Sequence, residues 1–155
     1  MECPANFAVV DPGVLWRGAR PDVPGMAWLS AQGVKTIINL ELLHGDAPPA
    51  GVTYITLPDF EPVAAVDPAL EDTHIRRVLA AIATTPKPAY IHCRDGQNRT
   101  GVAVAAYRII DKNDPVDAVV ADMLSYKGLW AEADERYIRG LAARRAEFSP
   151  PVRMG

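Results

Sequence analysis

The sequence predicts an α/β fold, with a single central, mostly parallel sheet of four to five strands flanked by helices. Short runs rich in β-branched residues alternate along the chain with longer runs that have helical spacing. Apolar residues make up 49% of the 155 residues, which is enough to bury a substantial core in one domain. No internal repeat or low-complexity segment interrupts this alternation. We therefore expect residues 1–155 to form a single domain.

Five short segments have the character of strands. They lie at residues 7–10, 14–16, 35–39, 52–57 and 89–92. Between the third and fourth of them, Pro48 and Pro49 predict a loop over residues 44–51.

Helices are expected in the segments between and after these strands, at residues 25–32, 68–83, 99–112 and 131–147. The second of them repeats apolar residues at the spacing of one buried face: Ile75, Val78, Leu79 and Ile82. A further helix is expected to begin with Asp114 as its N-cap and Pro115 at its first position. The tail 149–155 is expected to fray.

The most informative stretch is residues 92–101, His-Cys-Arg-Asp-Gly-Gln-Asn-Arg-Thr-Gly, which joins an apolar strand to an alanine-rich helix. In such a loop the backbone N–H groups turn inward, and the first helical turn adds unpaired donors and the positive end of its dipole. These donors can cradle a phosphate above Cys93. The residues predicted to bind it are Arg94, Asp95, Gly96, Gln97, Asn98 and Arg99.

Cys93 is the predicted nucleophile, because the inward amides, the helix dipole and Arg99 all favour its thiolate form. The planar fork of Arg99 can bind two phosphoryl oxygens and follow them into the transition state. Thr100 is expected to donate its hydroxyl to the sulfur. His92 is expected to orient the loop through backbone hydrogen bonds.

Cleaving a phosphate ester with a poor leaving group also needs a proton donor, and Asp59 is the predicted general acid. It follows the strand 52–57 at the end where ligands bind in open α/β sheets, which is also the end of the phosphate loop. Asp67 is the alternative, although it would make a good helix N-cap. Asp72 lies within the first helical turns and would complement the dipole there. Glu61 is a weaker candidate donor.

At residues 92–101 the sequence resembles the cysteine-dependent protein tyrosine phosphatase superfamily, whose signature is His-Cys-x5-Arg-Ser/Thr. Segments 7–21, 29–40, 105–110 and 118–123, together with Trp130 and residues 136–138, are similar to its compact bacterial dual-specificity-like and inositol-phosphatase-like branch. Such proteins usually read Tyr-Arg-Ser where this chain has Trp16-Arg17-Gly18, and have arginine where it has Glu41. The resemblance implies a dual-specificity-phosphatase-like fold and an aspartate acid on a separate loop.

Together these features predict a phosphomonoester hydrolase that acts through a phosphocysteine. The short chain has no insertion of the kind that deepens the pocket of strict phosphotyrosine enzymes, so the pocket should be shallow. Arg94 adds a positive charge, and further cations are expected at the rim: Arg17, Arg20, Lys127 and Arg136. An inositol polyphosphate is therefore the predicted substrate, and phosphotyrosine or phosphoserine would also fit. The alternatives are an RNA 5′-triphosphatase and a catalytically silent phosphate-binding module.

The composition restricts the partners and cofactors of the chain. The net charge of −3 argues against a broad nucleic-acid surface, and three scattered histidines predict neither a metal site nor another cofactor: His44, His74 and His92. Cys3 is expected to stay a free thiol, because a disulfide would consume Cys93. No signal peptide or 18-residue apolar run is visible, which predicts a cytoplasmic monomer away from membranes, or a secreted one if a signal peptide was removed.

Overall fold

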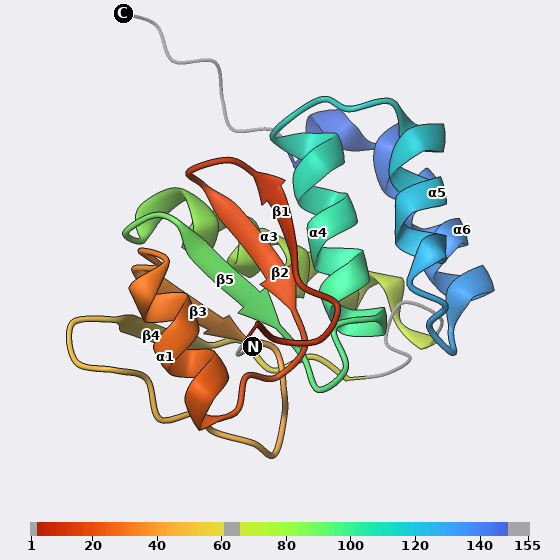
Figure 1. The fold of residues 1–155 in the computed structure, drawn as a ribbon. Coiled ribbons are helices and arrows are strands. Elements are labelled where there is room, and N and C mark those ends of the chain that lie inside the picture. The colour runs from red at the N-terminus through yellow and green to blue at the C-terminus, as the bar shows by residue number, and fades with distance from the viewer. Residues whose placement is uncertain (1–2, 61–65, 149–155) are drawn as a thin grey trace, which may run out of the picture.

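The computed structural model describes residues 3–60 and 66–148, which are organised around one five-stranded sheet (Figure 1). The strand order is β1 (Ala8–Asp11), β2 (Leu15–Gly18), β5 (Ala89–His92), β3 (Thr36–Asn39) and β4 (Thr53–Thr56). β1 pairs with β2 in the antiparallel sense, and the remaining neighbours pair in parallel. The predicted mostly parallel α/β sheet is thus confirmed. Glu61 and the tail 149–155 lie outside the described residues.

Helices cover both faces of the sheet, as a largely parallel sheet requires. α1 (Val23–Ala31) lies in front of the sheet in Figure 1, where Met26 and Leu29 pack with Tyr90 in a small core. The main core lies on the other face and involves α3 (Pro68–Thr84), α4 (Asn98–Ile110), α5 (Val116–Ser125) and α6 (Ala131–Ala143). Within the described ranges, no helix is long and apolar enough to span a membrane.

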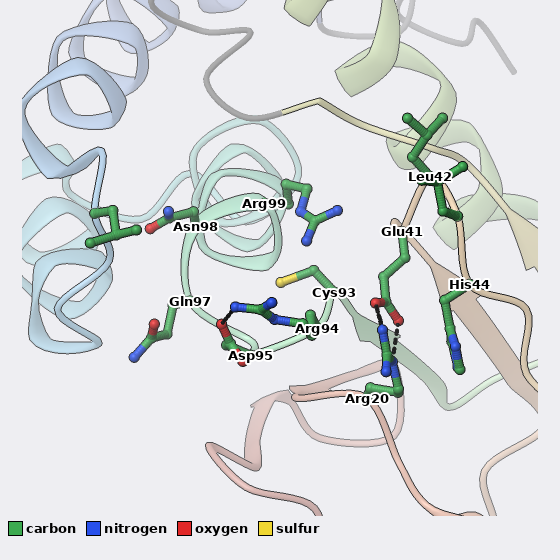
Figure 2. A pocket seen from close by; sticks show the side chains of 12 residues that line it. Arg20, Glu41, Leu42, His44, Cys93, Arg94, Asp95, Gln97, Asn98 and Arg99 are labelled. Carbon is green, nitrogen blue, oxygen red and sulfur yellow. Dashed lines mark hydrogen bonds and ion pairs between the residues drawn. The ribbon is translucent and has the colours of Figure 1, made fainter.

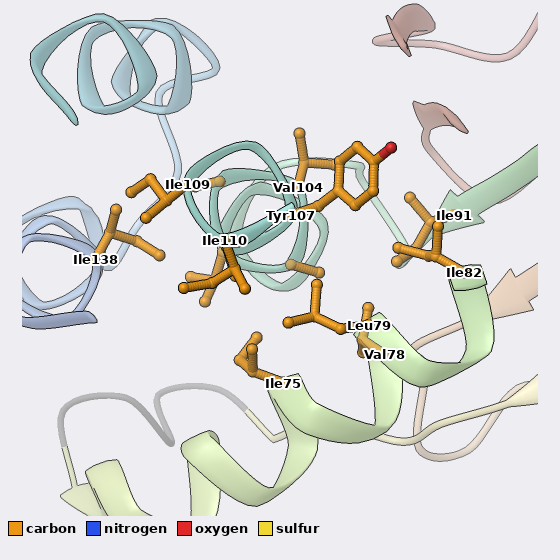
Figure 3. Packing of buried hydrophobic residues seen from close by; sticks show 14 of the residues in the cluster. Ile75, Val78, Leu79, Ile82, Ile91, Val104, Tyr107, Ile109, Ile110 and Ile138 are labelled. Atoms are coloured by element: carbon orange, nitrogen blue, oxygen red, sulfur yellow. The ribbon is translucent and has the colours of Figure 1, made fainter. Parts of the chain in front are cut away.

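α3 and α4 form the centre of the main core. The apolar face predicted for α3 is confirmed, and Figure 3 shows its side chains directed toward α4: Ile75, Val78, Leu79 and Ile82. α3 starts as its sequence indicates, because the Asp67 carboxylate accepts a hydrogen bond from the Leu70 N–H at 3.1 Å. α4 is buried over almost its whole length, so the phosphate loop before it stands on a rigid support.

The prediction that Asp114 caps the helix after α4 is wrong. Its carboxylate accepts a hydrogen bond from Arg108 Nε at 2.9 Å, and Pro115 takes the N-cap position instead, so α5 begins at Val116. A charged guanidinium donor makes a stronger hydrogen bond than a backbone amide, which explains why the Asp114 carboxylate pairs with Arg108 and does not cap α5. The predicted helix 131–147 is also interrupted, because α6 ends at Ala143 and a short 3₁₀ helix, η1 (Arg145–Glu147), follows.

The register of the strands brings four strand ends together at one edge of the sheet. Gly18 of β2 and Asn39 of β3 both lie opposite His92 of β5, and Asn39 also lies opposite Thr56 of β4. The segments that follow these residues therefore leave the sheet side by side. This is the edge at which open α/β sheets bind ligands.

Truncation of a core side chain on α3 should destabilise the fold. We expect Leu79→Ala, at 8% exposure, to lower the free energy of unfolding by about 2–5 kcal/mol, because it leaves a cavity between α3 and α4. Leu70→Ala is the matched control on the same helix at 49% exposure, with an expected cost of about 0.5 kcal/mol or less. Urea denaturation followed by circular dichroism measures both. Equal losses in the two variants would contradict the packing described here.

Candidate active site

The phosphate loop begins at Cys93, directly after β5, and ends where α4 starts at Asn98. It borders a cavity of about 460 Å³ into which Figure 2 shows the Cys93 sulfur pointing, between Arg94 and Arg99. Cys93 is 2% exposed, and Cys3 is likewise a free thiol, as predicted. The structure thus places the predicted nucleophile beside most of the predicted phosphate-binding residues, which line the same cavity: Arg94, Asp95, Gln97, Asn98 and Arg99.

Gly96 faces away from the cavity and packs on the segment that follows β2. Its φ of +73° lies in the left-handed region, and a Cβ atom there would come within 2.5 Å of the Gly18 carbonyl carbon and 2.7 Å of the Ala19 nitrogen. Beside this contact, the Arg20 N–H donates to the Arg94 carbonyl oxygen at 3.0 Å. A glycine is therefore needed for the loop to dock against β2.

Arg17 supports the loop from the interior, so its predicted place at the substrate rim is wrong. It is 1% exposed, its Nη2 donates to the Gly96 carbonyl oxygen at 2.7 Å, and its guanidinium lies 3.7 Å from the centre of the Tyr126 ring. Burial lowers the pKa of Arg17 from its usual value, although Tyr126 and other nearby groups oppose that shift. This hydrogen bond fixes the peptide that follows Gly96, so Arg17 supports the loop from inside the protein.

His92 is held by an acidic partner that the sequence did not reveal. It is fully buried, with Nε2 2.6 Å from Asp46 Oδ2 and Nδ1 3.1 Å from the Cys93 carbonyl oxygen. Burial alone would raise the pKa of Asp46, but the hydrogen bond and charge of His92 outweigh it and hold that pKa below its usual value. The contact with the Cys93 backbone agrees with the predicted orienting role of His92.

The cavity wall opposite Arg99 is formed by an ion pair between Arg20 and Glu41. Arg20 donates from Nε to both carboxylate oxygens of Glu41 at 3.0 and 3.2 Å, and from Nη2 to Oε1 at 2.5 Å (Figure 2). The sequence noted Glu41 as a departure from its relatives but gave it no role. Its position two residues after β3 was the available signal, because the same rule of strand ends selected Asp59 after β4.

Two more of the predicted rim cations are not part of the described cavity wall. Lys127 and Arg136 are exposed, but neither is among the described residues that line the cavity. Arg136 lies on α6, and Lys127 lies in the turn after α5 with a φ of 57°. Of the four predicted rim cations, Arg20 is the one that the described cavity wall contains.

Thr100 lies on the first turn of α4 with its side chain fully buried. Its hydroxyl has no hydrogen-bond partner among the residues that the structure describes, which includes the sulfur of Cys93. A buried hydroxyl without a partner is uncommon, so Thr100 retains an unused hydrogen-bond donor. The predicted hydrogen bond from Thr100 to the sulfur therefore stays a prediction.

Asp59 lies in a buried cluster with two residues of α3. Its Oδ2 is 3.5 Å from His74 Nδ1, which lies 3.8 Å from Glu71 Oε1, while His74 Nε2 donates to the Leu57 carbonyl oxygen at 2.8 Å. Burial, reinforced by the charge of Glu71, raises the pKa of Asp59 to about 7. Burial alone would lower the pKa of His74, but the adjacent carboxyls of Glu71 and Asp59 raise it. The cluster therefore retains protons near neutral pH.

The same three side chains place one ligand atom each within 4.8 Å of one another, a spacing that is also compatible with a metal ion. The scattered histidines of the sequence gave no sign of this grouping. Neither Asp59 nor the alternative acid Asp67 is among the described residues that border the cavity. Asp59 faces His74, and the Asp67 carboxylate accepts from the Leu70 amide.

The loop, its cysteine and its arginine can be compared with those of known proteins. A family model described as the tyrosine phosphatase family matches residues 4–146. This chain belongs to the tyrosine phosphatase family. Family membership confirms the resemblance found in the sequence, and with it a phosphatase of the tyrosine phosphatase type.

Individual members of the tyrosine phosphatase family match over nearly the whole chain. The dual specificity protein phosphatase TpbA of Pseudomonas aeruginosa is 28% identical over 173 residues, which cover 95% of this chain and 75% of TpbA. A crystal structure of TpbA in complex with pTyr matches with a TM-score of 0.64 and 27% identity, covering 94% of this chain and 99% of that one. The catalytic core of the PP-IP phosphatase SIW14 from S. cerevisiae shares the fold, with a TM-score of 0.73, 17% identity and 96% coverage of both chains.

Replacement of Gly96 should disrupt the phosphate loop. We expect Gly96→Ala to abolish most phosphatase activity and to cost at least about 1–3 kcal/mol of stability, because it adds left-handed strain and a clash with the backbone after β2. Gly45→Ala is the matched control, since a Cβ there meets nothing within 4 Å. Turnover of an aryl phosphate and the melting temperature report the two effects. A fully active Gly96→Ala protein would show that the loop does not depend on this contact.

Proposed function

We propose that this chain hydrolyses phosphomonoesters through a phosphocysteine intermediate formed on Cys93. The observation that carries the proposal is the position of the Cys93 sulfur, which points into a cavity bordered by Arg99 at the start of a buried helix. The loop amides and the helix dipole favour an anion at that position. The family of the chain and the dual-specificity activity named for TpbA support the same chemistry.

The reaction proceeds in two displacements. In the first, the Cys93 thiolate attacks phosphorus in line with the leaving oxygen, so that an S–P bond forms as the P–O bond breaks. A carboxylic acid protonates the departing oxygen. In the second, water attacks phosphorus, the same carboxylate takes a proton from it, and the S–P bond breaks to release phosphate and the thiolate.

The surrounding residues act on the phosphoryl group and on the sulfur. Arg99 binds two phosphoryl oxygens that lie outside the line of attack and retains them in the transition state. The buried Thr100 hydroxyl, which lacks a partner among the described residues, donates to the sulfur when it becomes a leaving group. His92, anchored by Asp46, holds the Cys93 carbonyl and thereby positions the first residue of the loop.

Asp59 is the proposed general acid. It follows β4 at the active edge of the sheet, and a pKa of about 7 leaves its carboxyl protonated at mildly acidic to neutral pH, as a proton donor requires. Asp67 is the alternative, and its exchange would remove the N-cap of α3 as well.

The acid assignment predicts a change in the pH profile. Because Asp59 donates as the protonated form, turnover of an alkyl phosphate should be highest below about pH 7 and fall as the pH rises through that value. Asp59→Asn should lower this turnover by about 10²–10⁴-fold and remove the basic limb, with a smaller effect on aryl phosphates, whose leaving groups need little protonation. Asp67→Asn serves as the comparison. A basic limb that persists in Asp59→Asn and disappears in Asp67→Asn would reassign the acid.

The substrate class depends on the charges of the cavity wall. The sequence predicted an inositol polyphosphate, on the strength of cations at the rim, and three of those four positions lie away from the described wall. The cavity instead contains three exposed or half-exposed leucines beside the loop: Leu42, Leu43 and Leu129. We therefore propose a monoester with a single phosphate as the preferred substrate, for which the TpbA complex with pTyr offers one model.

Nucleophilic attack by Cys93 predicts a specific loss of activity. Cys93→Ser should reduce turnover of p-nitrophenyl phosphate to background, because a neutral hydroxyl is a far weaker nucleophile than a thiolate. Cys3→Ser, the same exchange at the other free cysteine, should retain wild-type turnover. Rapid acid quenching followed by mass spectrometry should detect a phosphoryl group on Cys93. Substantial turnover by Cys93→Ser would refute the phosphocysteine mechanism, and an inactive wild type would favour a silent phosphate-binding module.

A further inference from the structure

Glu41 is fixed in the cavity wall by the ends of two strands. Its backbone N–H donates to Asn39 Oδ1 at 2.9 Å, and the N–H of the preceding Leu40 donates to the His92 carbonyl oxygen at 2.8 Å. The residue is 4% exposed although it borders the cavity. The backbone at Glu41 is therefore held in place, and its side chain is buried where it borders the cavity.

This carboxylate occupies the donors of Arg20. Both carboxylate oxygens accept from Arg20 Nε, and one of them also accepts from Nη2, which is a forked arrangement typical of strong arginine–carboxylate pairs. The Arg20 side chain is 37% exposed and the Glu41 side chain 5% exposed. The cation is thus the reachable member of the pair, and its charge is already compensated.

The second outer arginine of the cavity is also paired. Arg94 Nη2 donates to Asp95 Oδ2 at 3.1 Å. The cavity wall therefore presents three arginines together with two carboxylates, and Arg99 is the arginine assigned to the reacting phosphate.

We infer that Glu41 is a specificity-determining residue that restricts this site to substrates with one phosphate and disfavours those with a second phosphate close by. The inference rests on the proposed function, since it concerns the same cavity. A second phosphate would lie beside a fixed carboxylate of the same sign. To bind Arg20 it would have to displace Glu41, which would leave a buried carboxylate without its cation.

The remainder of the cavity wall suits a substrate whose non-phosphate part is apolar. Leu42 and Leu43 directly follow Glu41, and Leu129 lines the same cavity from the segment before α6. Leu43 is 95% exposed and Leu129 is 87% exposed, so both remain available for contact. The cavity wall thus offers apolar side chains to the non-phosphate part of a substrate.

Binding measurements in a Cys93→Ser background test this inference without turnover. Isothermal titration calorimetry gives the affinities of phenyl phosphate and inositol hexakisphosphate for Cys93→Ser and for the same protein with Glu41→Gln. We expect Glu41→Gln to raise the affinity for inositol hexakisphosphate relative to phenyl phosphate at least tenfold, or about 1.4 kcal/mol. Glu135→Gln, which removes a carboxylate paired with an arginine on α6, should leave that ratio unchanged.

Two further outcomes make the result unambiguous. Arg20→Gln removes the cation and leaves the carboxylate, so the ratio should move in the opposite direction, and melting temperatures establish that each variant is folded. A ratio that stays within twofold in folded Glu41→Gln protein would overturn the inference, as would an equal rise in Glu135→Gln. Because binding is measured on an inactive background, a failure of the phosphocysteine mechanism would appear as inactive wild-type protein with these affinities intact.

Discussion

The geometry of the site depends on the close approach of Gly96 to the backbone of Gly18 and Ala19. At this contact the loop that carries Cys93 docks on the end of β2, where there is no room for a Cβ atom. The buried Arg17 side chain donates a hydrogen bond to the Gly96 carbonyl oxygen, and the Arg20 N–H donates to the carbonyl oxygen of Arg94. β2 and β5 are neighbours in the sheet, and their ends are in register at Gly18 and His92, which brings the loop to the end of β2.

Both departures from the usual family pattern have a structural explanation. A Cβ at Gly18 would lie 2.3 Å from the hydroxyl of Tyr90, which donates to the Ala19 carbonyl oxygen at 2.6 Å, so Gly18 makes room for a buried tyrosine. Glu41, in place of the usual arginine, forms the ion pair with Arg20. With Gly18 in place, the loop is still held by hydrogen bonds from Arg17 and the Arg20 amide. Glu41, in contrast, changes the charge of the cavity wall that a substrate contacts.

The sequence was sufficient for those features that depend on local spacing, and insufficient for contacts between distant segments. The phosphate loop, the buried face of α3 and its Asp67 cap follow from residues a few positions apart, and all are present. The buried position of Arg17 could have been predicted in part from the sequence, because Leu15, two residues earlier on the same side of β2, belongs to the main core. The pairing of His92 with Asp46 was not, since it joins residues 46 positions apart and no local pattern marks it.

One rule of topology places both carboxylates that matter to this site, and burial then gives them different properties. Glu41 follows β3 and Asp59 follows β4, so each leaves the sheet at the edge where Cys93 follows β5. Glu41 is buried against an arginine that donates to both of its carboxylate oxygens. Asp59 is buried beside Glu71 and His74, and its pKa is raised to about 7. Two carboxylates in the same type of position thus differ in their surroundings: Glu41 forms an ion pair with Arg20, whereas Asp59 is buried in a cluster where its carboxyl retains a proton near neutral pH.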